Sequence, residues 1–161
     1  MQKNQITFFL GSEIYSQFRK KALKNQIKNI NSEITSIEAI YTYVIESKDL
    51  LTNATKENLQ KLLGADNNVL PNFKTENNLF IGPRIGTISP WSSRATDIIK
   101  NCGINILRIE RLSLFNLKTK SDNGILKKEL LQIGQLIYDK MTDSIFLDQN
   151  NIKELFIHKK P

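Results

Sequence analysis

The densest group of side chains that could bind a charged ligand lies in the segment RIGTISPWSSRATD. Its candidate site residues are Arg84, Thr87, Ser89, Trp91, Ser92, Ser93, Arg94, Thr96 and Asp97. A helix that begins here would direct unpaired amides and the positive end of its dipole at an anion. The segment therefore predicts a site for phosphate or carboxylate. The alternative is a helix start capped by Ser92 or Ser93, with Trp91 packed on a neighbouring domain.

Residue types that perform nucleophilic or metal chemistry are scarce. A cysteine needs a nearby base to act as a nucleophile, and the chain offers one cysteine, Cys102, and one histidine, His158. Cys102 precedes Gly103 at a predicted helix end, and His158 lies in a basic tail. We assign no catalytic residue and no metal ligand. The sequence contains no P-loop, so we do not expect this chain to bind ATP by itself.

Strands and helices are expected to alternate along the chain and to position this segment. Apolar and β-branched runs predict strands at residues 5–10, 34–45, 79–82, 104–117 and 155–157. Helical periodicity and capping signals predict helices from Ser12 to about residue 30, then at 55–63, 93–101 and 126–141. Thr55 is the candidate cap of the second helix, and Gly64 is expected to end it. The Asn-rich stretch 65–78 is expected to be a loop.

An internal repeat appears when the chain is shifted by 72 positions. Eleven of the 34 positions from Ile27 to Gln60 are then identical, without a gap. We therefore predict an α+β fold built as an internally duplicated pseudo-dimer, with halves at about 1–75 and 76–158. Each half would read strand, helix, strand, helix, strand, and two open sheets would pair about a pseudo-twofold axis. The rival is a single irregular sheet in which the repeat is accidental.

Two carboxylates recur in this repeat. Glu38 falls on Glu110, and both lie in predicted long strands. We expect symmetric structural roles for them, such as pairing across the pseudo-dimer.

The basic charge of the chain has two interpretations. The formal net charge is +7, and Lys20, Lys24 and Lys28 share one predicted helix face. A small basic nucleic-acid-binding module is one alternative. The other is a lysine-rich and asparagine-rich composition with a solvated face, because the lysines are scattered and no RRM, KH or helix-turn-helix pattern is present. No secretion signal or spanning segment is found, so we expect a cytoplasmic protein without a membrane partner.

A longer signature surrounds the candidate segment. Gly82 and GTISPWSSRATDI are followed by Asn101, Cys102 and Gly103, and then by Ile109, Glu110 and Arg111. This pattern resembles the amino-terminal domain of the large, single-chain phosphoribosylformylglycinamidine synthases (FGAM synthases, also called FGAR amidotransferases). Weaker similarity extends from Gly11 and Ser12 to Glu154, Leu155 and Phe156.

The resemblance implies a domain of a multidomain ligase of purine biosynthesis. In that family a glutaminase domain releases ammonia, and a synthetase domain uses ATP and magnesium to form the amidine. The family's amino-terminal domain is similar to a dimer of the small accessory subunit of the split enzyme. Residues 1–161 are then expected to be an excised domain that is inactive alone and binds no cofactor. Its partners would be the synthetase and glutaminase domains, with small-molecule substrates only in the whole enzyme, and Arg84 to Asp97 would face the synthetase active site.

Overall fold

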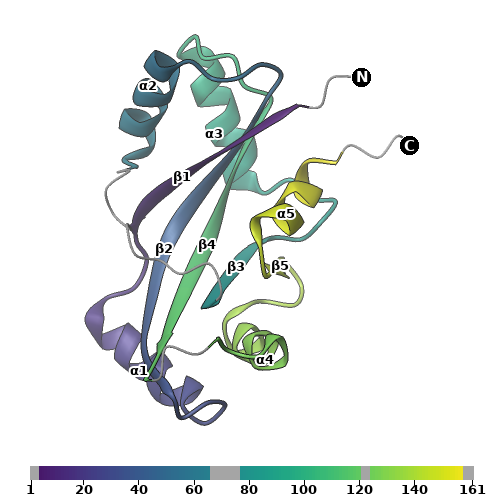
Figure 1. The fold of residues 1–161 in the computed structure, drawn as a ribbon. Helices are drawn as coiled ribbons and strands as arrows, with labels where there is room; N and C mark the ends of the chain where they lie inside the picture. Colours follow the sequence, from purple (N-terminus) through teal and green to yellow (C-terminus); the bar gives the residue numbers. More distant parts are fainter. Residues whose placement is uncertain (1–3, 66–76, 121–123, 158–161) are drawn as a thin grey trace.

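Strands and helices alternate along the part of the chain that the structure describes, residues 4–65, 77–120 and 124–157 of a computed structural model. In chain order the elements are β1 (Gln5–Glu13), α1 (Gln17–Ile27), β2 (Ile34–Ser47), α2 (Asn53–Leu63), β3 (Asn78–Pro83), α3 (Pro90–Asn101), β4 (Arg108–Thr119), α4 (Lys127–Ile137), β5 (Asp143–Phe146), α5 (Gln149–Ile152) and the 3-10 helix η2 (Lys153–Phe156). Within these residues, five strands form one antiparallel sheet in the order β1-β2-β4-β3-β5 (Figure 1). The predicted α+β class is confirmed.

The two long strands at the centre of the sheet join the two halves. β2 and β4 pair along almost their whole lengths, so the two open sheets expected from the sequence are the halves of one continuous sheet. Edge-to-edge pairing satisfies backbone groups that two separate sheets would have left unpaired at their edges. The register places Tyr41 opposite Ser113, the residue 72 positions further along.

The repeat agrees with the order of the elements. Shifted by 72 positions, the bounds of β1, α1, β2 and α2 fall within two residues of those of β3, α3, β4 and α4. The twofold relation itself stays a prediction, which superposition of residues 5–64 on 77–140 tests. Among the described residues no strand follows α2 in the first half, and residues 66–76 lie outside the description.

The faces of the sheet carry different layers because side chains alternate along a strand. On one face, α1 and α4 cover a core that includes Ile37 and Phe115, and α2 and α3 cover a second core around Tyr43 and Ile109. On the other face, α5 and η2 cover a core that includes Leu112. Figure 1 shows the helices of the first face gathered at opposite ends of the long strands. The middle of this face, at Tyr41 and Ser113, lies between the two helix pairs.

Helix starts and the last strand differ from the sequence predictions. Ser16, and not Ser12, caps α1, since Ser12 belongs to β1. Thr52, and not Thr55, caps α2, whereas Gly64 ends it with φ +63° as expected. Residues 155–156 belong to η2, so the strand predicted at 155–157 is wrong, and β5 is the closing strand instead. Asp148, which accepts from the Asn151 amide at 2.9 Å, caps a short helix there.

Candidate functional site

The loop between β3 and α3 carries the first residues of the predicted site. Gly86 adopts φ +90°, a conformation that favours glycine. The hydroxyl of Thr87 donates to the Arg84 carbonyl at 2.6 Å, and the Thr87 amide donates to the same oxygen at 3.0 Å. The Ile85 amide donates to Ser144 Oγ at 3.2 Å. These bonds fix the loop backbone on the edge of the sheet.

Ser89 starts α3. Its hydroxyl accepts from the Ser92 amide at 3.0 Å and donates to Glu110 Oε1 at 2.9 Å. Pro90 follows at the first helical position, where its missing amide costs nothing. The helix therefore starts three residues earlier than predicted, and Ser89 rather than Ser92 or Ser93 is its cap. The carboxylate at the helix start is supplied by the chain itself, through Glu110.

A buried ion pair holds this arrangement in place. Glu110 is fully buried and pairs with Arg108, which is 9% exposed. Arg108 also donates to the Thr87 carbonyl at 2.9 Å and to the Leu155 carbonyl at 2.7 Å. The pair thus joins the loop, β4 and η2. The pairing across the halves suggested for Glu38 and Glu110 is not what the structure has, because Glu110 binds Ser89 and Arg108 of its own half and Glu38 binds Lys20, likewise of its own half.

Two hydroxyls of α3 bind the backbone of β4. Ser92 Oγ donates to the Ile109 carbonyl at 2.5 Å, and the Ile109 amide donates to Thr96 Oγ1 at 3.2 Å. Ser92 and Thr96 are both buried. These side chains replace the ladder bonds that β3 would supply, since β3 pairs with β4 only as far as Ser113. Their hydroxyls therefore have structural partners.

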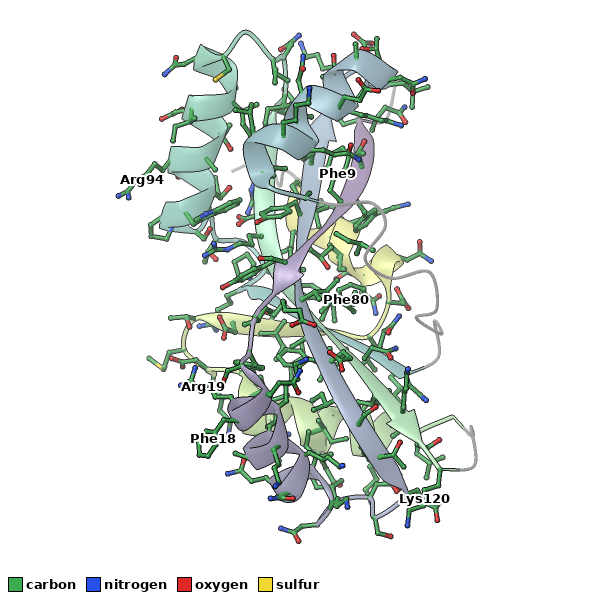
Figure 2. All side chains as sticks on the ribbon, turned by 90° about the vertical axis from the view of Figure 1, so that its left-hand side faces the viewer. Phe9, Phe18, Arg19, Phe80, Arg94 and Lys120 are labelled. Atoms are coloured by element: carbon green, nitrogen blue, oxygen red, sulfur yellow. The ribbon has the colours of Figure 1, made fainter. Side chains whose placement is uncertain are left out.

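The predicted residues separate into two pockets. A pocket of about 500 Å³ lies on the face of the sheet covered by α1 to α4 and includes four of them: Arg84, Thr87, Ser89 and Trp91. A second pocket of about 350 Å³ is lined by Ser92, Ser93, Thr96 and Asp97, together with Glu46 and Arg108. Arg94 lines neither, and Figure 2 shows its side chain extending away from the sheet. The nine residues do not converge on one ligand.

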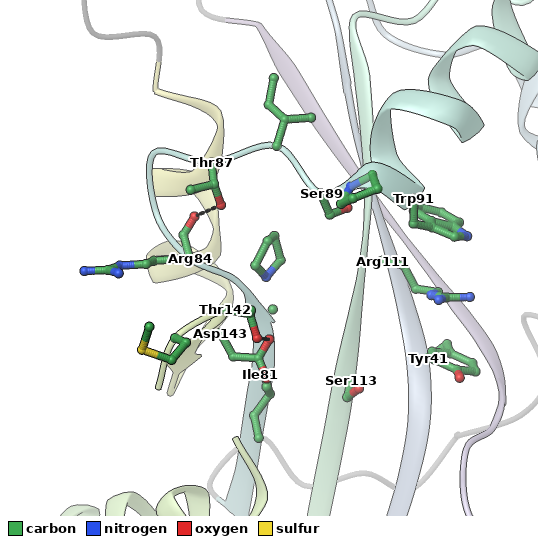
Figure 3. A pocket seen from close by; sticks show the side chains of 15 residues that line it. Tyr41, Ile81, Arg84, Thr87, Ser89, Trp91, Arg111, Ser113, Thr142 and Asp143 are labelled. Atoms are coloured by element: carbon green, nitrogen blue, oxygen red, sulfur yellow. Dashed lines mark hydrogen bonds between the residues drawn. The ribbon is translucent and has the colours of Figure 1, made fainter. Parts of the chain in front are cut away.

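The larger pocket contains residues that the sequence-based list missed. Arg111 lies between two aromatic rings, with its guanidinium carbon 4.7 Å from the Tyr41 ring centroid and 4.8 Å from that of Trp91 (Figure 3). Tyr43 packs behind Trp91 at 5.9 Å between ring centroids. Burial raises the pKa of Tyr43, although Arg111 opposes the rise. Arg111 already belonged to the family signature as the residue after Glu110, and that signal could have identified it.

Nucleophile and metal candidates remain dispersed. Cys102 is exposed at the far end of α3 from Ser89. His158 lies outside the described residues. In the described part of the chain, no three cysteine, histidine or acidic side chains gather as metal ligands. A helix that could span a membrane is likewise not found in these residues.

The basic row on α1 is not a continuous solvated stripe. Lys20 is buried and donates to Glu38 at 2.8 Å, with Glu13 at 3.6 Å. The expectation of a solvated face is wrong for this lysine, and one of the three charges proposed for nucleic-acid binding is neutralised. Lys24 and Lys28 remain at least partly accessible.

The ion pair of Lys20 predicts a pH dependence of stability. The hydrogen bond with Glu38 raises the pKa of Lys20 despite an opposing effect of burial. A raised pKa in the folded state means that the stabilisation is complete below about pH 10.4, the value of a free lysine, and is lost as the pH rises through the folded-state pKa. Urea unfolding of wild type and Lys20→Met, measured from pH 9 to 12, should show their difference in unfolding free energy shrinking toward high pH. An unchanged difference across this range would contradict the prediction.

Comparison with known families agrees with the signature around α3. The family model described as "Formylglycinamide ribonucleotide amidotransferase N-terminal" matches residues 40–156. The match includes the loop, α3, β4 and both pockets, and it confirms the resemblance recognised in the sequence. The chain belongs to the formylglycinamide ribonucleotide amidotransferase N-terminal family, the amino-terminal domain family of FGAM synthase.

Proposed function

We propose that this chain is the docking domain of an FGAM synthase, which makes phosphoribosylformylglycinamidine from phosphoribosylformylglycinamide, glutamine and ATP in purine biosynthesis. Its role is to hold the synthetase and glutaminase parts together, with Arg84 to Asp97 facing the synthetase part. ATP and magnesium would act in the synthetase part and not in this domain. Family membership supports the assignment to FGAM synthase, and the surface beside α3 supports the docking role.

The observation that carries the proposal is a rigid loop with an apolar surface. Ile85, Ile88 and Met141 are 47%, 61% and 78% exposed. Ile88 and Met141 both line the larger pocket, which Trp91 also lines. Buried Arg108, paired with Glu110, binds the Thr87 carbonyl next to Ile88 and so fixes the loop backbone there. A contiguous apolar surface rimmed by polar groups is typical of a protein interface, and a fixed backbone reduces the entropy lost on docking.

The positions of the polar groups argue against chemistry within the domain. Ser89, Ser92 and Thr96 all bind protein groups, and Cys102 lies at the other end of α3. The segment is therefore better suited to present a surface than to transfer a proton or a group.

A charge placed in this surface tests the proposal. In the complete synthase, Ile88→Asp should lower the amidine formed per glutamine hydrolysed by about tenfold, because a carboxylate would be buried without a partner in the interface. The measurement is the ratio of product to glutamate at saturating substrates.

Ile98 offers a matched control. It is an isoleucine of α3 with 54% exposure, and it lines neither pocket. Ile98→Asp should leave the ratio within about twofold, since a surface substitution away from an interface has little effect. Equal ratios for Ile88→Asp, Ile98→Asp and wild type would refute the docking role of this loop.

A further inference from the structure

Arg111 differs from the other exposed arginines of the chain because both faces of its guanidinium are covered. The Tyr41 and Trp91 rings lie 4.7 and 4.8 Å from its central carbon, on opposite sides of it in Figure 3. Aromatic stacking fixes the plane of a guanidinium and leaves its N–H donors at the edges. The three residues come from β2, α3 and β4, so the tertiary structure holds the arginine in place.

The donors of Arg111 are available to an outside acceptor. Among the described residues, no hydrogen bond or ion pair to its guanidinium is found, and the residue is exposed. Of the described residues that line this pocket, only Asp143 carries a carboxylate, and its oxygens accept from the Asp139 amide at 3.1 Å and from Thr142 Oγ1 at 3.3 Å. The pocket therefore presents a fixed guanidinium that no described carboxylate binds directly.

The surroundings select the kind of acceptor. The pocket is also lined by Arg84, and its apolar lining includes Ile88 and Met141, both strongly exposed. A stacked arginine within an apolar rim has the composition of an interface hot spot, in which the rim excludes water from a central polar contact. A planar guanidinium with free edges binds a carboxylate through two parallel hydrogen bonds.

We propose that Arg111 is the anchor that binds an aspartate or glutamate side chain of the synthetase part, carried by a segment with apolar side chains beside it. The inference rests on the proposed docking function and names the chemistry of the partner. The apolar side chains cover Ile88 and Met141, and the carboxylate enters the pocket to reach Arg111.

Charge reversal in the complete synthase tests this contact. Arg111→Glu should raise the hydrogen exchange rate of amides in residues 84–91 by about tenfold and lower the amidine formed per glutamine by a similar factor, because two carboxylates would then meet. Arg111→Gln should move both readouts in the same direction, since it removes the charge without adding a repulsion. Arg111→Lys should restore only part of the wild-type value, because an ammonium cannot make the paired contact.

Arg19→Glu is the matched control. Arg19 is an exposed arginine of α1 that lies 5.9 Å from one aromatic ring, Tyr15, and it lines neither of the two pockets. For this variant we expect the wild-type hydrogen exchange rate in residues 84–91 and the wild-type amount of amidine formed per glutamine hydrolysed. Thermal unfolding of each purified variant distinguishes a lost contact from a lost fold. If Arg111→Glu does not fold, Arg111→Gln provides the test.

Two results would overturn the inference. Wild-type amide hydrogen exchange in both Arg111→Glu and Arg111→Gln would show that Arg111 binds no carboxylate of the synthetase part. A raised KM for a phosphorylated substrate with unchanged exchange would assign Arg111 to a small-molecule site instead. If Ile88→Asp uncouples the enzyme whereas the Arg111 variants do not, the docking function stands and only the carboxylate anchor fails.

Discussion

Replacing Glu110 by alanine is expected to lower the free energy of unfolding by about 3–5 kcal/mol, because it leaves the buried Arg108 without its counter-ion. Glu110 is fully buried, and its loss also removes the acceptor of the Ser89 hydroxyl at the start of α3. A domain of ordinary stability has about 5–15 kcal/mol in total, so much of the stability would be lost. Urea unfolding monitored by fluorescence of Trp91, the single tryptophan of the chain, measures the change.

Glu38 supplies the control for this prediction. It lies 72 positions before Glu110, but its side chain is 36% exposed, and its partner Lys20 also has Glu13 within 3.6 Å. Glu38→Ala should therefore cost about 1 kcal/mol or less, because the Glu38 carboxylate is partly solvated and Glu13 remains near Lys20 as a counter-ion. Similar costs for the two substitutions would show that the Arg108 and Glu110 pair does not hold the loop and α3 as inferred.

Truncation of Phe146 to alanine is expected to cost about 3–5 kcal/mol in unfolding free energy through lost apolar contacts and the cavity that remains. Phe146 is 2% exposed, pairs with Phe80 across β5 and β3, and belongs to the core that includes Leu112. Since Thr142 and Asp143 at the start of β5 line the larger pocket, amide exchange there should rise as well. Urea unfolding and hydrogen exchange measure the two effects.

Leu50 is the comparison for this truncation. It is 77% exposed, so Leu50→Ala should change the unfolding free energy by no more than about 0.5 kcal/mol. A Phe146→Ala variant as stable as Leu50→Ala would mean that α5 and η2 do not close a packed core over β3 and β4.

The sequence determined the local features of this protein and its family. The β-branched run in β2 and the left-handed Gly64 after α2 follow from backbone preferences that act within a few residues. The GTISPWSSRATD signature identified the family because its residues are consecutive, and the family match confirmed it. The 72-residue repeat predicted the shared order of strands and helices in the two halves, although their twofold relation remains a prediction.

Tertiary structure decided which of several similar residues forms a helix cap or an ion pair. Ser89, Ser92 and Ser93 were all chemically able to cap α3, and Ser89 does so where Glu110 lies beside it, 21 positions away. In the sequence, Lys20 is one lysine of a basic row, whereas in the structure the packing of α1 on β2 buries it against Glu38. Cap choice and ion pairing depend on partners distant in sequence, which local preferences do not encode.

The same reason explains the sheet and the arginine site. Whether two long strands form separate sheets or pair at their edges depends on contacts between the halves, and the pairing of Tyr41 with Ser113 decided it. That register brings Tyr41 of β2 beside Arg111 of β4, and α3 adds Trp91 from a third segment. The sequence contained each of these residues, but only strand register and helix packing placed an arginine between two rings with its donors facing solvent.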